Sequence, residues 1–319
     1  MSTSGIELIQ PRPVPRPGRW ASAAIVAVLA AMALNSLITN ENFQWPVVWQ
    51  WLFSKTIMVG VAFTLILTVG AMLIGTILAI TMAVMRQSPN PILGGVAWFY
   101  IWFFRGTPIY TQLIFWSLLP TLYPQLSIGI PFGPEFVKFT TAEYFTPFWM
   151  AIVGLSLNEG AYLSEIIRSG LNSVDKGQWE AATALGMGRG KIMRRIVLPQ
   201  AMRVIIPPLG NETISMLKTT SLVAAIPFIL ELTFAAKDKG QQLFAPVPLL
   251  LDAAIWYLVI TSILMVGQMY LERYFGRGFA GDSPKATGKG KSKRSLSERQ
   301  QAILSANTVH DDPFLDVTP

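Results

Sequence analysis

Long apolar runs recur along this chain and constrain its fold more than any other feature. A bilayer core about 30 Å thick needs roughly 20 apolar residues for a helix to cross it. Six runs meet or approach that length, and they cover approximately residues 20–38, 56–85, 92–119, 148–167, 204–232 and 249–270. Because a segment that crosses lipid must satisfy its own backbone hydrogen bonds, we expect each run to be a helix. The sequence therefore predicts an all-α, polytopic membrane protein.

The remaining composition excludes several classes of function. Charged residues make up 13% of the 319 residues, against about 25% in a typical soluble domain. The chain has no cysteine and a single histidine, His310, which lies in a polar tail. Disulfides and thiolate metal sites are thus excluded, a histidine base or histidine metal cluster is nearly excluded, and we expect no metal and no cofactor. The net charge of +7 does not indicate nucleic acid, because the basic residues gather in the tails and in one loop.

Basic residues near the ends of the runs predict the orientation in the membrane, since cytoplasmic loops carry an excess of lysine and arginine. With six spans, four basic regions share one side; they contain Arg12, Arg16 and Arg19, then Arg86, then Arg189, Lys191, Arg194, Arg195 and Arg203, then Arg273 and Arg277. We expect that side, and with it both termini, to be cytoplasmic. The first run lacks a convincing small-residue cleavage site, so we expect a retained span rather than a signal peptide.

The loop between the fourth and fifth runs carries a distinctive pattern. It reads Glu180-Ala181-Ala182, then Gly186 after three residues, then Ile196-Val197-Leu198-Pro199 after nine more. Asp175 is expected to cap a short helix here, with Gln178 as its capping-box partner. Gly186 and Gly188 are expected to end that helix.

The faces of this loop suggest contact with another surface. Trp179, Ala182 and Leu185 are expected to share one face of the short helix, and the small side chains of Ala181 and Ala182 permit close approach of a partner. A basic amphipathic stretch covers residues 191–198, and Pro199 is expected to end it. On composition alone, an interfacial helix lying on anionic lipid would also fit.

The full pattern, E-A-A-x3-G-x9-I-x-L-P, resembles the EAA loop of ABC importer permeases. The resemblance implies a cytoplasmic knob that sits in a groove of an ABC ATPase subunit and transmits its closure to the spans. Glu180 would face basic groups of the ATPase, or else interact with the N-terminus of its own helix. The implied coupling residues are Asp175, Trp179, Glu180, Ala181, Ala182, Leu185, Gly186, Ile196, Leu198 and Pro199.

Three further segments resemble the polar amino-acid uptake permeases, the histidine, glutamine and general L-amino-acid group. They are Phe104-Arg105-Gly106-Thr107-Pro108, Asn158-Glu159-Gly160-Ala161-Tyr162 and Leu217-Lys218-Thr219-Thr220-Ser221-Leu222. The resemblance covers about residues 54–275 and implies the ABC importer permease fold with a five-helix core. The implied organisation is a cytoplasmic tail 1–19, an extra transmembrane helix 20–39, the core 54–275 with its coupling loop 173–203, and a disordered cytoplasmic tail 276–319.

Charged residues inside the runs are candidates for a substrate pathway. A charge at mid-bilayer costs about 2.5–3.5 kcal/mol on insertion scales, so each should face protein or water. Glu159 is a candidate for the ammonium group of an amino acid, and Arg105 for its carboxylate. Alternatively, Arg105 pairs with a carboxylate and only holds helices together. Tyr162 follows Glu159 by three residues, so the two are expected to line one cavity.

The fifth run contains Pro207, Pro208 and Gly210, which predict a broken start to its helix. Freed backbone groups at membrane depth are tolerated only beside protein or a water-filled cavity. Asn211 and Glu212 follow directly, so they are further candidates for the substrate pathway.

These observations predict a permease subunit of an ABC importer for polar amino acids in the bacterial cytoplasmic (inner) membrane. The resemblance implies that ATP hydrolysis belongs to partner ATPase subunits, so we expect no catalytic residue in this chain. The segment 290–292 lacks the first glycine and the preceding strand of a P-loop, so the chain does not bind ATP by that route. An extracytoplasmic amino-acid-binding protein and a second permease copy or paralogue are the other expected partners. The alternative is an ion-coupled secondary transporter of small polar solutes, which suits intramembrane carboxylates but leaves the loop pattern unexplained. A membrane-embedded enzyme is disfavoured by the lack of cysteine and of intramembrane histidine.

Overall fold

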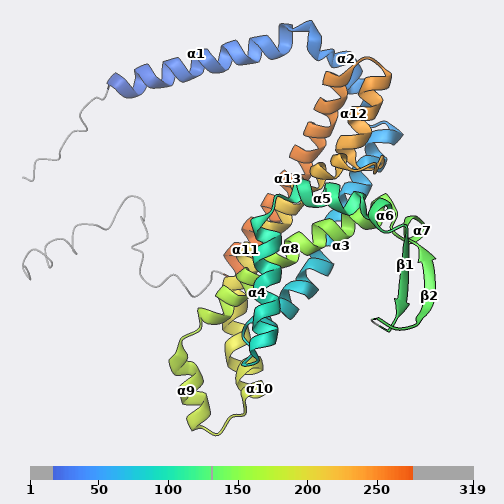
Figure 1. Cartoon of the computed structure of the whole chain (residues 1–319). Helices are drawn as coiled ribbons and strands as arrows, with labels where there is room; N and C mark the ends of the chain where they lie inside the picture. Colours follow the sequence, from blue (N-terminus) through green and yellow to red (C-terminus); the bar gives the residue numbers. More distant parts are fainter. Residues whose placement is uncertain (1–16, 131, 276–319) are drawn as a thin grey trace, which may run out of the picture. The chain divides into compact units, whose positions relative to one another are not determined.

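A computed structural model of the chain describes residues 17–130 and 132–275, so the expected tail 276–319 and most of the tail 1–19 lie outside the described residues. Helices dominate (Figure 1), which confirms the predicted fold class. They are α1 (Pro17–Thr39), α2 (Trp45–Trp51), α3 (Lys55–Arg86), α4 (Pro91–Gly106), α5 (Ile109–Ser117), α6 (Leu119–Leu122), α7 (Thr141–Tyr144), α8 (Pro147–Asn172), α9 (Lys176–Ala184), α10 (Arg189–Ile192), α11 (Leu198–Thr219), α12 (Leu232–Gln242) and α13 (Pro246–Phe275). Short 3-10 helices cover Glu41–Phe43 and Thr220–Ala225, and a π-helical turn covers Met193–Val197.

Three of the described helices, α1, α3 and α13, are long and apolar enough to cross a membrane. The hydroxyl of Ser54 caps α3 by accepting a hydrogen bond from the N–H of Ile57 at 3.4 Å. The helix then runs to Arg86, close to the predicted bounds 56–85. The apolar window of α1 has no buried residue within the described structure, so its surface is available to lipid or to another subunit.

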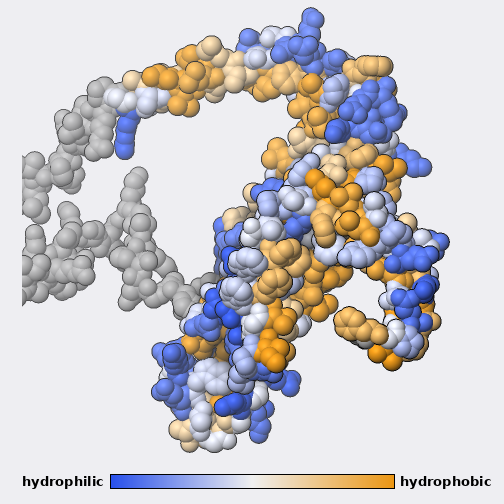
Figure 2. All heavy atoms as spheres, in the orientation of Figure 1, coloured by the Kyte–Doolittle hydropathy of each residue, from blue (hydrophilic) through white to orange (hydrophobic). Residues whose placement is uncertain are grey.

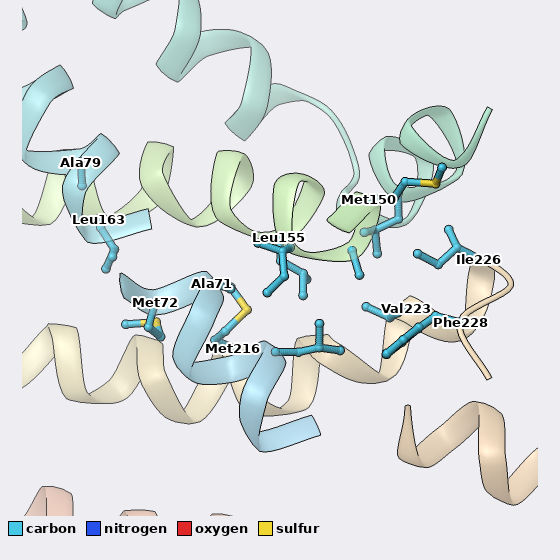
Figure 3. Packing of buried hydrophobic residues seen from close by; sticks show 14 residues of the cluster. Ala71, Met72, Ala79, Met150, Leu155, Leu163, Met216, Val223, Ile226 and Phe228 are labelled. Atoms are coloured by element: carbon cyan, nitrogen blue, oxygen red, sulfur yellow. The ribbon is translucent and has the colours of Figure 1, made fainter. Parts of the chain in front are cut away.

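Small residues allow α3 and α8 to pack closely. On α3 they recur at every fourth position and are buried: Ala71, Gly75, Ala79 and Ala83. A Cβ added to Gly75 would lie 3.2 Å from the Cβ of Glu159, and one added to Gly160 would lie 2.9 Å from the Cβ of Leu78. Close approach of this kind drives helix association in lipid, where burying apolar area gains little. Around this contact the core is completed by Leu155, Leu163, Met216, Val223 and Phe228 (Figure 3).

The third predicted span, 92–119, is not a single helix. The structure ends α4 at Gly106 and begins α5 at Ile109, with Thr107 and Pro108 extended between them. Pro108 has no N–H, and its ring disfavours helical backbone at the residue before it. The run is apolar throughout, but proline chemistry divides it.

The bounds predicted for the fifth span, 204–232, are also wrong. Helix α11 begins earlier, at Leu198, and ends at Thr219, and residues 226–231 are not helical. The predicted break at Pro207 and Pro208 does not occur, because α11 runs through both residues. The side chain of Gln268 on α13 supports this stretch by donating a hydrogen bond to the carbonyl of Pro207 at 2.7 Å. This bond ties α13 to α11 beside the two prolines.

A β-hairpin lies between α6 and α7 and was not predicted. Its strands β1 (Gln125–Gly129) and β2 (Glu135–Thr140) pair in antiparallel register. An exposed ion pair joins Lys138 Nζ to Glu135 Oε2 at 2.7 Å, and the hydrogen bond from Lys138 lowers the pKa of Glu135 from its usual value.

Apolar side chains cover wide areas of the helix surfaces (Figure 2). Those with more than half of their surface exposed include Leu73, Ile77, Trp102, Leu258 and Ile263. Exposed apolar surface on this scale marks contact with lipid or with another subunit.

Candidate functional site

The predicted coupling loop begins with the short helix α9, and Asp175 is its N-cap. The N–H of Gly177 donates to Asp175 Oδ1 at 2.6 Å. The predicted capping box is incomplete: Gln178 bonds to Asp175 through its backbone N–H (3.0 Å), and no side-chain bond returns from Gln178 among the described hydrogen bonds. A single well-formed cap is enough to fix where α9 starts.

Gly186 ends α9 as the sequence predicted. Its φ is +74°, a left-handed conformation that favours glycine. The N–H of Gly186 donates to the carbonyl of Thr183 at 2.9 Å, and the N–H of Met187 donates to the carbonyl of Ala182 at 3.1 Å. These two bonds form a Schellman motif, which reverses the chain after the helix.

The face that α9 presents outward differs from the prediction. Ala182 is buried within the chain, together with Ile192 and Val197, and Trp179 packs against the same cluster. Leu185, predicted on the same face, is 82% exposed. The reason is geometric: successive steps of three residues each drift about 60° around a helix, so Trp179 and Leu185 lie about 120° apart. Ala182 is therefore not available to a partner, whereas Glu180, Ala181 and Leu185 are exposed.

The second half of the loop is continuous with α11. Residues Arg189–Ile192 form α10, the π-helical turn Met193–Val197 follows, and α11 starts at Leu198. Pro199 was predicted to end a helix but instead occupies the first turn of α11, where its missing N–H costs nothing. Ile196 is half-buried, and Leu198 is 41% exposed.

Arg105 and Tyr162 lie together on the wall of a cavity of about 810 Å³. The guanidinium carbon of Arg105 lies 5.2 Å from the centre of the Tyr162 ring, a cation–π contact. The cavity is formed between the end of α3, α4 and α8. Its lining residues are Arg86, Gln87, Trp98, Ile101, Trp102, Arg105, Gly106, Tyr162, Glu165, Arg168 and Asn172.

Glu159 lies elsewhere and does not share the cavity just described with Tyr162, contrary to the prediction. It is buried at 4% exposure, beside Gly75 of α3, and it does not line the cavity of Arg105. A spacing of three residues turns the helix by about 60° from one side chain to the next. On α8 this directs Tyr162 toward α4 and Glu159 toward α3.

No ion pair joins Glu159 to Arg105 within the described residues, where the ion pairs are Lys138–Glu135 and Arg168–Glu165. The Oε1 atom of Glu159 is buried without a hydrogen-bond partner in the described structure. Glu212 on α11 is close enough for the two carboxylates to repel each other. Glu212 is half-buried and Asn211 beside it is exposed. The structure thus separates the predicted pathway residues into an acidic group and an arginine-lined cavity.

Two amides at the break between α4 and α5 were missed as site residues by the sequence interpretation. Gln112 Nε2 donates to the carbonyls of Phe104 and Thr107, both at 3.0 Å, and to the Thr107 hydroxyl at 2.7 Å. Asn158 Nδ2 also donates to the carbonyl of Phe104, at 2.9 Å. These bonds satisfy backbone groups that the proline break frees at membrane depth. The sequence offered one signal for them, the proline inside an apolar run. A proline leaves the carbonyl four residues earlier without its helical donor, so a buried side chain elsewhere in the chain must donate to it.

Gln112→Met should lower the stability of the permease. Methionine keeps the volume but removes the Gln112 donor from the Thr107 carbonyl and leaves the Phe104 carbonyl with Asn158 alone. An unsatisfied buried group costs about 1–3 kcal/mol of unfolding free energy. The measurement is thermal unfolding of the detergent-solubilised protein. Gln242→Met on the exposed end of α12 is the matched control, and an equal loss in both variants would contradict this role of Gln112.

A second polar cluster fixes the start of α12. Glu231 is fully buried and caps α12 by accepting hydrogen bonds from the N–H groups of Thr233 (2.8 Å) and Phe234 (3.1 Å). Thr64 of α3 and Tyr257 of α13 donate to its other oxygen. Glu231 therefore joins three helices and starts a separate helix, α12, inside the predicted run 204–232.

A helical membrane chain with this loop pattern is a permease subunit of an ABC importer. Residues 71–277 match the family described as binding-protein-dependent transport system inner membrane component, and the chain belongs to that family. This confirms the family that the sequence resembled.

The relatives are amino-acid permeases. The arginine transport system permease protein ArgU of Corynebacterium glutamicum is 48% identical over 304 residues, covering 95% of this chain and 90% of the relative. The L-cystine transport system permease protein TcyB of Bacillus subtilis is 35% identical and covers 76% of this chain and 96% of the relative. A crystal structure of an amino acid ABC transporter with histidines matches with a TM-score of 0.59 at 33% identity, covering 73% of this chain and 98% of that one.

The protein is therefore a membrane-embedded permease component of an amino-acid ABC importer, as predicted. Its relatives are permease subunits that work with separate ATPase subunits and a periplasmic binding protein, so the chain is not itself the enzyme.

Proposed function

We propose that this permease serves an importer of cationic polar amino acids, the arginine class. The main support is Glu159, a buried carboxylate without an ion-pair partner among the described residues. Glu212 is a second acidic group nearby. A buried charge is costly unless it is paired, and a guanidinium or ammonium group of the cargo would pair with it. The name of the relative ArgU supports the same class.

Competition for uptake tests this proposal. In membrane vesicles that contain the permease, its ATPase subunits and the binding protein, unlabelled arginine and lysine should suppress uptake of labelled arginine. Glutamate should not, because two carboxylates at the site repel an acidic side chain. Equal suppression by glutamate would contradict a cationic cargo.

We propose further that ATPase subunits dock on α9 and drive the spans through the buried side of the coupling loop. Glu180, Ala181 and Leu185 supply an exposed surface for docking. Beneath them, Ala182 packs with Ile192 and Val197, and the same cluster continues into α11 through Ala201 and Ile205. Close-packed protein interiors transmit displacement, so movement of α9 would move α11. The other proposed partners are a second permease copy or paralogue and an extracytoplasmic binding protein.

The proposed topology has both termini in the cytoplasm of a bacterial cell, with α1 as an extra span. Its support is the arginine and lysine content of the loops, above all the region 189–203. A reporter active only in the cytoplasm should be active when fused after Pro319, and one fused between α6 and α7 should be inactive. The reverse result would contradict this orientation.

A further inference from the structure

We propose that the cavity between α3, α4 and α8 binds the phosphate-bearing headgroup of an anionic phospholipid. Three guanidinium groups line it, from Arg86, Arg105 and Arg168, with one carboxylate, Glu165. The planar guanidinium fork matches the oxygen geometry of phosphate. The proposal concerns a site apart from Glu159 and does not depend on which amino acid is transported.

The charges in this cavity are not balanced within the described structure. Glu165 is already engaged, because Arg168 donates to it through both Nε and Nη2, with Nη2 2.6 Å from Oε2. Arg105 contacts the face of Tyr162 and has no carboxylate within ion-pair distance among the described residues, and the same holds for Arg86. Two guanidinium groups thus remain for an anion from outside.

Aromatic side chains form the open wall of the cavity. Trp98 and Trp102 stack with their ring centres 6.0 Å apart and an interplanar angle of 9°, and they are 51% and 57% exposed. Tryptophan is enriched at the level of lipid headgroups, because its ring is apolar and its N–H is polar. A wall of this kind suits the glycerol and upper acyl chain that follow a bound phosphate.

One end of the cavity lies at the proposed cytoplasmic leaflet, and Arg105, in the last turn of α4, lines its deeper end. Arg86 is the last residue of α3 and Asn172 the last of α8, and both helices run toward the basic side of the membrane. Basic pockets between helices on that side are suited to anionic headgroups. A cationic cargo would be repelled here, since the cavity lining carries three arginines against one glutamate.

Lipid binding to the purified permease–ATPase complex tests this site. After delipidation, the complex is titrated with phosphatidylglycerol or phosphatidylcholine, and bound lipid is counted by native mass spectrometry. The intact complex should retain phosphatidylglycerol in preference to phosphatidylcholine. Each arginine near an anionic headgroup contributes about fivefold in affinity, so the double variant Arg86→Gln, Arg105→Gln should bind phosphatidylglycerol about thirtyfold more weakly.

Matched variants separate a lipid site from its alternatives. Arg273→Gln, in the last turn of α13 and outside the cavity, should bind phosphatidylglycerol like the unmodified protein. If the double variant does not accumulate, Arg105→Lys replaces it: lysine keeps the charge but loses the guanidinium fork, so phosphatidylglycerol should bind more weakly than to the unmodified protein. Unchanged phosphatidylglycerol binding in the double variant would overturn the proposal. Displacement of the lipid by equimolar inorganic phosphate would also overturn the proposal, because the cavity would then bind a soluble anion. Displacement by free arginine would overturn it too, because the cavity would then bind the carboxylate of the cargo.

Discussion

Leu185→Asp should abolish uptake while leaving the permease folded in the membrane. Leu185 is 82% exposed at the end of α9, so an aspartate there disturbs no internal packing. In the proposed complex it would place a charge in an apolar contact with the ATPase. Loss of a central interface residue costs about 2 kcal/mol or more, roughly thirtyfold in affinity. Co-purification of the ATPase subunits should fall with uptake, and Glu180→Arg should act in the same direction.

Two further variants show whether the effect is one of docking. Leu243 is also a C-cap leucine, at the end of α12, and Leu243→Asp should leave ATPase co-purification unchanged. Ala182→Leu overfills the buried cluster beneath α9 and should reduce the amount of folded protein instead. If Leu185→Asp retained the ATPase and transported normally, α9 would not be the docking surface.

Hydropathy predicted the bounds of helices with a regular backbone. It did not predict where an apolar run is divided into two helices. The run 56–85 corresponds to α3 because its small residues pack without interrupting the helix. The run 92–119 is broken at Pro108, and the run 204–232 ends early at Thr219. In the first segment, Asn158 of α8 bonds to the carbonyl of Phe104, and in the second, Thr64 of α3 and Tyr257 of α13 bond to Glu231. A single-sequence pattern contains no information about these partners.

The coupling loop shows the same limit at smaller scale. Spacing predicted the cap at Asp175 and the left-handed glycine at Gly186, because both are local. The burial of Ala182 depends on packing against Ile192 and Val197, which the pattern does not specify. Pro199 was wrongly predicted to end a helix. In the structure, α10, the π-helical turn and α11 follow one another directly, and the sequence pattern does not show this continuity. Local chemistry was therefore predictable, and the choice of exposed face was not.

Glu159→Gln should weaken recognition of a cationic amino acid without lowering the amount of folded permease. Glutamine keeps the shape and removes the charge. A hydrogen bond to a charged group is worth about 1.5–3 kcal/mol, so the apparent affinity for arginine should fall tenfold to a hundredfold. No ion pair would be lost, since Arg105 contacts Tyr162 instead and Glu159 has no ion-pair partner among the described residues. Uptake kinetics and membrane abundance are measured on the same samples, with Glu143→Gln, an exposed carboxylate on α7, as the control. Reduced abundance of the Glu159→Gln variant with unchanged affinity for arginine would make Glu159 a structural residue. In that case, Glu212→Gln should also leave the selectivity for cationic amino acids unchanged.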